Sequence, residues 1–143
     1  MTFDRPIVVD TGVLVSAAIR PESVPALVLQ KALLHYELCA SEATFAELQD
    51  VLSRSKFDRY AVAKTRQAFV EGLLLYVRLV NLLPVDVSQV VNDCSDPKDN
   101  KFLALALAVN AEMIVASDPH LTAMHPWRGI PILPPAAFLV GVR

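Results

Sequence analysis

Short apolar runs alternate along the chain with longer stretches in which apolar residues recur at helical spacing. The runs are too short for helices and are bounded by polar or turn-forming residues, which is typical of buried strands. A further run contains a proline, which cannot donate to a central ladder, and it is predicted to be an edge strand. The four buried strands are predicted at Pro6–Asp10, Glu37–Ala40, Glu112–Ala116 and Gly129–Leu133, and the edge strand at Leu82–Val85.

Helices are predicted between these strands. Ser23 and Ser41 are the residue type that caps a helix N-terminus, and each precedes a stretch with helical apolar spacing. An alanine- and leucine-rich run after Asp96–Pro97 predicts a buried helix that begins near Asp99. The predicted helices cover residues 13–19, 24–36, 42–52, 61–80 and 99–109, whereas residues 87–95 are predicted to be irregular and the residues after Pro135 to form a short apolar tail.

Strands that alternate with helices indicate an α/β fold with a central, mainly parallel sheet. The 143 residues fit one domain, 1–143, without repeats or linkers. Parallel sheets of this kind bind ligands at the carboxyl ends of their strands, near the point where the strand order reverses. Residues that directly follow the predicted strands are therefore the first candidates for a functional site.

Composition narrows the class of protein. With 54% hydrophobic and 20% charged residues, the chain is not disordered, and it contains no 18-residue apolar run. No basic region followed by an apolar core opens the sequence, so a secretory leader is not expected. Two cysteines do not form a disulfide framework, so a cytoplasmic protein without a membrane partner is expected. The apolar surplus, with a mean hydropathy of +0.42, predicts a covered hydrophobic surface and a homodimer.

Four acidic residues are predicted to meet at one edge of the sheet. Asp10 and Asp118 each follow an apolar strand, and Asp99 and Glu47 lie near the starts of helices that precede or follow strands. In right-handed crossovers, such helix starts lie at the carboxyl edge of the sheet. Each acid alone is more readily explained as a cap, a turn residue or a solvated side chain, but the joint placement of all four is not.

Four carboxylates at one point raise one another's pKa unless cations balance them. Oxygen ligands without clustered His or Cys suit a hard divalent ion, Mg²⁺ or Mn²⁺. Pairs of such ions activate water and stabilise the leaving oxygen in phosphodiester hydrolysis. The net charge of −2 does not by itself indicate nucleic-acid binding. Without these four acids, however, the chain has 11 acidic residues against 13 Lys and Arg, so the overall charge does not exclude binding to a polyanion.

The same segments resemble the motifs of PIN-domain ribonucleases, most strongly those of the bacterial branch of toxin–antitoxin toxins. The resemblance spans nearly the whole chain and depends on the order of the motifs. They are Val9–Ala17, Ser41–Leu52 with Glu47, Asp96–Ala106 and Ile114–Leu121, followed by Ile132–Pro135.

The resemblance implies a three-layer α/β/α sandwich and an endoribonuclease that depends on Mg²⁺ or Mn²⁺. Asp10, Glu47, Asp99 and Asp118 would be catalytic and hold metal, with Asp96 as an accessory ligand. The implied partners are an RNA substrate and a cognate antitoxin. The chain departs from the family in having Gly12 where Asn is common and Pro119–His120 where Lys–Asp is common.

The register of the third motif leaves a choice between Asp99 and Asn100 as the ligand. Candidate substrate contacts are hydroxyls beside the acids and nearby cations, although turn hydrogen bonds or solvated charges explain each of them individually. These candidates are Thr11, Ser117, Arg20, Lys98 and Lys101. Trp127 is expected to pack against the sheet rather than stack on a base.

Two other functions are compatible with parts of this pattern. The first alternative is a PIN-like module with a degraded site that acts by binding protein or RNA, and Gly12 is the residue that favours it. The second is a phosphotransferase of the haloacid-dehalogenase type, because Asp10 is followed by Thr11. That chemistry needs a second Asp two residues after the first, and Gly12 occupies this position.

Overall fold

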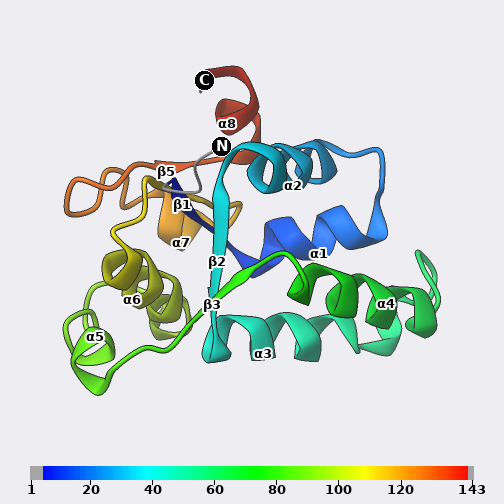
Figure 1. The fold of residues 1–143 in the computed structure, drawn as a ribbon, viewed down its shortest axis with the longest axis horizontal. Helices are drawn as coiled ribbons and strands as arrows, with labels where there is room; N and C mark the ends of the chain where they lie inside the picture. The colour runs from blue at the N-terminus through cyan, green and yellow to red at the C-terminus, as the bar shows by residue number, and fades with distance from the viewer. Residues whose placement is uncertain (1–4, 142–143) are drawn as a thin grey trace.

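Five parallel strands form the centre of the molecule in the order β3-β2-β1-β4-β5 (Figure 1). The computed structural model describes residues 5–141. The strands are β1 Pro6–Val9, β2 Glu37–Ser41, β3 Arg78–Val80, β4 Met113–Val115 and β5 Ile132–Leu133.

The strand order reverses beside β1. The chain moves outward from β1 through β2 to β3, and then returns to the other side of β1 for β4 and β5. Ile7 lies opposite Leu38 of β2, and Val8 lies opposite Ile114 of β4. The carboxyl ends of β1 and β4 therefore flank the topological switch point, which is where parallel sheets bind ligands.

Helices cover both faces of the sheet, so the predicted three-layer architecture is confirmed (Figure 1). Alternate strand residues point to opposite faces: Ile7 and Val9 belong to one core cluster, and Val8 and Ile114 to the other. The first layer contains α1 Thr11–Ile19, α2 Val24–His35, α3 Glu42–Leu52, α4 Ala63–Leu74 and α8 Pro135–Gly141. The second contains α5 Pro84–Ser88, α6 Asn100–Val109 and α7 Pro119–Thr122, and two short 3₁₀ turns are η1 Ser55–Phe57 and η2 Pro97–Asp99.

Local capping signals predict the starts of α2 and α3 correctly. The Ser23 hydroxyl accepts a hydrogen bond from Ala26 N at 3.3 Å. Ser41 Oγ accepts from Thr44 N at 3.2 Å, and Thr44 Oγ1 accepts from Ser41 N at 2.9 Å. Such reciprocal caps satisfy N–H groups that have no partner within the helix.

Two predictions in the middle of the chain are wrong. The helix predicted over residues 61–80 ends at Leu74, and Arg78–Val80 form β3 beside β2. The edge strand predicted at residues 82–85 is absent, because Pro84 starts helix α5 and the Asp86 carboxylate accepts from Leu83 N at 2.8 Å. Proline suits the first turn of a helix because its missing N–H is not needed there.

The short apolar tail predicted after Pro135 forms helix α8. Phe138 of α8 is fully buried and packs on Tyr36, with ring centroids 5.4 Å apart. Lys31 Nζ of α2 donates to Phe138 O at 2.7 Å. Helix α8 therefore closes the core over α2.

No individual helix within residues 5–141 combines the length and the apolar character that crossing a bilayer requires. Helices α1 and α2 reach that threshold only when they are taken together, and they meet at an angle of 109°.

We expect Phe138→Ala to lower the free energy of unfolding by about 3–5 kcal/mol, because it empties a fully buried aromatic site. Urea unfolding followed by circular dichroism measures the change. Val140→Ala is the matched control, since Val140 lies in the same helix and is 85% exposed. Equal effects of the two substitutions would show that α8 is not part of the folded core.

Candidate acidic site at the sheet switch point

Asp10 joins the two strands at the switch point through its carboxylate. Its Oδ1 atom accepts from Val13 N at 3.0 Å and caps α1. Its Oδ2 atom accepts from Ser117 N at 3.0 Å and Asp118 N at 3.2 Å, both just beyond β4. Asp10 is only 3% exposed, and its carboxylate holds the segments that follow β1 and β4 together.

The pKa of Asp10 is raised above its usual value, and burial is the main cause. The three backbone N–H groups oppose this shift because they stabilise the ionised form, whereas the charge of Asp118 adds to it. The charge that Asp10 brings to the switch point is therefore held mainly by backbone dipoles.

Asp99 lies at the end of η2, directly before α6, and is 7% exposed. Its pKa is raised from 3.8 to about 7, first by burial and then by a hydrogen bond to Asp118 and the negative charges of Asp118 and Asp96. The positive charge of Lys101 partly offsets the shift. Burial and the neighbouring acids therefore favour the neutral form of the Asp99 carboxyl group.

The choice between Asp99 and Asn100 is resolved by their hydrogen bonds. Asn100 Oδ1 accepts from Cys94 N at 2.9 Å, and its Nδ2 donates to Val91 O at 3.0 Å. The amide thus holds the loop before η2. Asp99 Oδ2, in contrast, is buried without a hydrogen-bond partner, so Asp99 is the residue available to the site.

Glu47 reaches the site from the second turn of α3. Its Oε1 atom lies 2.7 Å from Lys101 Nζ, while the side chains are 31% and 23% exposed, respectively. The contact is an ion pair by distance, and Oε1 makes no directed hydrogen bond.

All four predicted acids line one cavity of about 260 Å³ between α1, α3, α6 and the end of β4. Thr11 and Ser117 also line it, as predicted for hydroxyls beside the acids. Phe102 and Pro119, which were not predicted as site residues, complete the wall together with Gly12. The apolar character of the Asp99–Val109 run marks Phe102 as buried but does not show that it faces a cavity.

The other predicted site residues lie outside the cavity wall. Asp96 Oδ1 accepts from Lys98 N at 3.1 Å, and the Asp96 charge still contributes to the raised pKa of Asp99. Lys98 is exposed. Arg20 caps the far end of α1, about 13 Å along the helix, and its guanidinium lies 5.3 Å from the centre of the Tyr60 ring.

The donor set fits a hard divalent cation. The cavity presents carboxylate and hydroxyl oxygens, and two buried ones, Thr11 Oγ1 and Asp99 Oδ2, have no hydrogen-bond partner. A bound cation would satisfy these atoms and lower the pKa of Asp99. Within residues 5–141, however, no three His, Cys, Asp or Glu side chains are already arranged as metal ligands, so binding requires side chains to turn.

Gly12 affects the shape of the cavity through Ser117. A Cβ atom at position 12 would lie 2.7 Å from Ser117 Oγ and 3.8 Å from Asp10 Oδ1. Because a hydroxyl can rotate away, a side chain at position 12 is compatible with the backbone but displaces Ser117 from its present place.

The aromatic and thiol groups near the site have structural roles. Trp127 is 6% exposed, and its Nε1 donates to Asp93 Oδ2 at 2.8 Å, so it packs against the protein as expected. His120 Nδ1 lies 2.9 Å from Ser95 Oγ, and this contact links α7 to the loop before η2. Cys39 and Cys94 are buried, free thiols.

The chain belongs to the PIN domain family, whose family model matches residues 6–120. The comparison with curated proteins found no match to this chain. Solved structures share the fold at low identity. VapBC2 from Rickettsia felis, solved on a promoter DNA fragment, is 14% identical, with a TM-score of 0.66 and coverage of 90% of this chain and 98% of that one.

Two further structures give the same result. VapBC from Salmonella typhimurium, also bound to DNA, is 15% identical with a TM-score of 0.66, and the match covers 92% of this chain and 98% of that one. VapC20 from Mycobacterium tuberculosis, described as a toxin that cleaves the sarcin-ricin loop, is 15% identical with a TM-score of 0.59, covering 83% and 95%. At these identities the likeness establishes the fold.

We expect Asp99→Asn to stabilise the metal-free protein at pH 8 but not at pH 4. The unfolded chain ionises Asp99 near pH 3.8, whereas the folded state retains the proton up to about pH 7. Folding stability is therefore lost as the pH rises from about 4 to 7 and stays lost above 7. The substitution should add on the order of 2–4 kcal/mol at pH 8, measured by urea unfolding in EDTA.

The control for this prediction is Asp96→Asn, which removes a neighbouring charge outside the cavity wall. It should add much less stability than Asp99→Asn at pH 8. An equal gain from Asp99→Asn at both pH values would show that the ionisation of Asp99 does not oppose folding.

Proposed function

We propose that the protein is a metal-dependent endoribonuclease that hydrolyses RNA phosphodiester bonds and acts as the toxin of a type II toxin–antitoxin pair. The observation that carries this proposal is the convergence of Asp10, Glu47, Asp99 and Asp118 on one cavity at the switch point. Membership of the PIN domain family and the shared fold of the VapC and VapBC structures support it.

The proposed ligands for Mg²⁺ or Mn²⁺ are the carboxylates of Asp10, Glu47, Asp99 and Asp118, with Asp96 as an accessory acid. A bound divalent ion in such a site polarises the scissile phosphate and increases the acidity of water. All the proposed ligands are oxygen atoms, which suits these hard ions.

The side chains that line the cavity are proposed to have different roles. Asp10 fixes the carboxyl ends of β1 and β4 relative to each other through its three backbone hydrogen bonds. Asp99 Oδ2, buried and without a hydrogen-bond partner, is an oxygen that a bound cation would satisfy. The hydroxyls of Thr11 and Ser117 border the same cavity and would orient a phosphate oxygen or water.

A basic segment at the far end of α1 and α3 supports an extended RNA contact. Residues 53–67 contain five of the thirteen Lys and Arg residues and one acid. Arg66 is buried and Arg54 pairs with Asp50, so the exposed cations of this segment that are open to a phosphate are Lys56, Arg59 and Lys64. The guanidinium groups of Arg20 and Arg59 each lie 5.3 Å from the centre of the Tyr60 ring. Neither arginine forms an ion pair within residues 5–141, so both are available to phosphates.

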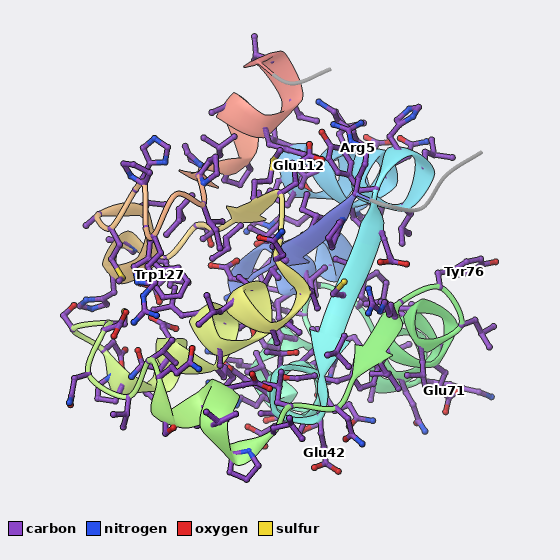
Figure 2. All side chains as sticks on the ribbon, turned by 60° about the vertical axis from the view of Figure 1, so that its left-hand side comes forward. Arg5, Glu42, Glu71, Tyr76, Glu112 and Trp127 are labelled. Atoms are coloured by element: carbon purple, nitrogen blue, oxygen red, sulfur yellow. The ribbon has the colours of Figure 1, made fainter. Side chains whose placement is uncertain are left out.

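Exposed apolar side chains support a partner surface, which we propose as the site of homodimer formation. They concentrate in and after α4, where Tyr76 projects away from the body of the molecule (Figure 2). Large apolar side chains exposed in this number are typical of proteins with interaction surfaces. The residues are Leu74, Leu75, Tyr76, Leu79, Leu83, Val85, Val87 and Val91, with exposures of 42–80%. The antitoxin is proposed to cover the acidic cavity.

The purified protein is expected to cleave total bacterial RNA in Mn²⁺ or Mg²⁺ but not in EDTA. Asp99→Asn should lower the cleavage rate by about 100-fold or more, because it removes a site carboxylate. It is a better test than Asp10→Asn, which would point an amide N–H₂ at backbone donors that now bind Asp10. Gel electrophoresis of the RNA over time measures the rate.

Glu112→Gln is the matched control for the cleavage assay. Glu112 is also an acid beside β4, but it lies at the opposite edge of the sheet, paired with Arg5 at 2.8 Å (Figure 2). It should cleave like the parent protein. Metal-independent cleavage, or an undiminished rate in Asp99→Asn, would contradict the proposed site, whereas no cleavage by a folded parent protein would favour the degraded-site alternative.

We expect the double variant Arg20→Ala/Arg59→Ala to bind single-stranded RNA about 3- to 10-fold more weakly and with a smaller salt dependence, because two phosphate contacts are lost. Fluorescence anisotropy in Mg²⁺, in an Asp99→Asn background that prevents cleavage, measures both quantities. Arg78→Ala is the control, since Arg78 is 51% exposed but pairs with Glu37 at 2.9 Å. Equal losses in the control and the double variant would contradict a localised RNA contact.

A further inference from the structure

Lys101 connects two elements that both carry acids of the site. It lies in the first turn of α6, two residues after Asp99, and its ammonium is 2.7 Å from Glu47 Oε1 on α3. The same ammonium also donates to the carbonyl oxygen of Lys98. The side chain is thus held across the gap between α6 and α3, with 23% of it exposed.

No other lysine or arginine within residues 5–141 pairs with a carboxylate of the cavity. The remaining ion pairs of that part of the chain involve Asp50, Asp58, Asp93, Glu37 and Glu112, none of which lines the cavity. In the part of the chain that the structure describes, Lys101 is therefore the only cation paired with any of the four converging acids. Its charge also lowers the pKa of Asp99, so its influence extends beyond Glu47.

We propose that Lys101 is an internal counter-ion that occupies Glu47 in the metal-free protein and releases it when a divalent cation binds. This inference rests on the proposed metal site. A divalent ion bound to Glu47 would lie close to the Lys101 ammonium, which is 2.7 Å from Oε1, so the two cations repel each other and compete for the same carboxylate.

Lysine is suited to this exchange. Its ammonium is a compact charge on a flexible four-carbon chain, whereas the planar guanidinium of arginine forms more rigid paired contacts with carboxylates. Once released from Glu47, the ammonium remains near the exposed Lys98, where the two cations would contact an RNA phosphate. Lys101 would therefore contact the RNA substrate only in the metal-bound state.

The decisive measurement is Mn²⁺ binding by isothermal titration calorimetry to the parent protein and to Lys101→Met. Removing the competing ammonium should tighten Mn²⁺ binding by about 3- to 10-fold, since a partly buried ion pair no longer has to be broken. Lys98→Met is the matched control because it removes the same charge three residues away, from a side chain without an ion pair. It should change the affinity by less than about 2-fold.

A second measurement separates competition for Glu47 from a general charge effect. In a Glu47→Gln background, Lys101→Met should change Mn²⁺ affinity by less than about 2-fold, because the contested carboxylate is gone and only the weaker effect of the charge on Asp99 remains. In EDTA, Lys101→Met should melt a few degrees below the parent protein, while Lys98→Met should melt near it. A raised melting temperature for metal-free Lys101→Met would overturn the role of Lys101 as a stabilising counter-ion.

The outcomes distinguish this inference from the proposed function. If the parent protein binds Mn²⁺ and Lys101→Met binds it equally well, the counter-ion role is wrong and the metal site stands. If Lys98→Met tightens binding as much as Lys101→Met, the effect is long-range electrostatics and the inference is again overturned. If neither the parent protein nor any variant binds Mn²⁺, the metal site and the inference are both rejected.

Discussion

The Asp10 carboxylate accepts hydrogen bonds from three backbone N–H groups, and the arrangement of the site depends on these bonds. One oxygen caps α1 directly after β1, and the other accepts from Ser117 N and Asp118 N, the second and third residues after β4. The loops that follow β1 and β4 diverge at the switch point, where the hydrogen bonds of the sheet ladder end. Asp10 holds these loops together, and the positions of Thr11, Ser117 and Asp118 around the cavity follow from that connection.

The site concentrates negative charge that the fold balances only in part. Backbone donors stabilise Asp10, and the Lys101 ammonium pairs with Glu47. At Asp99 the Lys101 charge offsets only part of the effect of burial and of the neighbouring acids Asp118 and Asp96, which raise its pKa to about 7. An arrangement that opposes folding when it ionises is typical of residues whose position serves a ligand rather than stability. The unsatisfied oxygens of Thr11 and Asp99 are consistent with this interpretation.

Local signals account for what the sequence predicts correctly. Ser23, Ser41 and Asp10 each cap the helix that they precede, so the element boundaries and the carboxyl edge of the sheet follow from nearby residues. The errors depend on distant partners. Strand β3 exists because β2 offers an open edge, which helical periodicity over residues 61–80 does not reveal. Likewise, only the contacts of Asn100 with Cys94 and Val91 establish which residue of the third motif faces the site.

The departure at Gly12 is better explained as an exchange between two loops than as the loss of a polar group. Any side chain at position 12 would meet Ser117 Oγ, which a Cβ atom there would approach to 2.7 Å. Because Gly12 has no side chain, the Ser117 hydroxyl can occupy this part of the cavity wall. A side chain at position 12 would occupy the same place. Positions 12 and 117 are coupled by this contact, so a polar group next to Asp10 is retained even though Gly12 has no side chain to provide one.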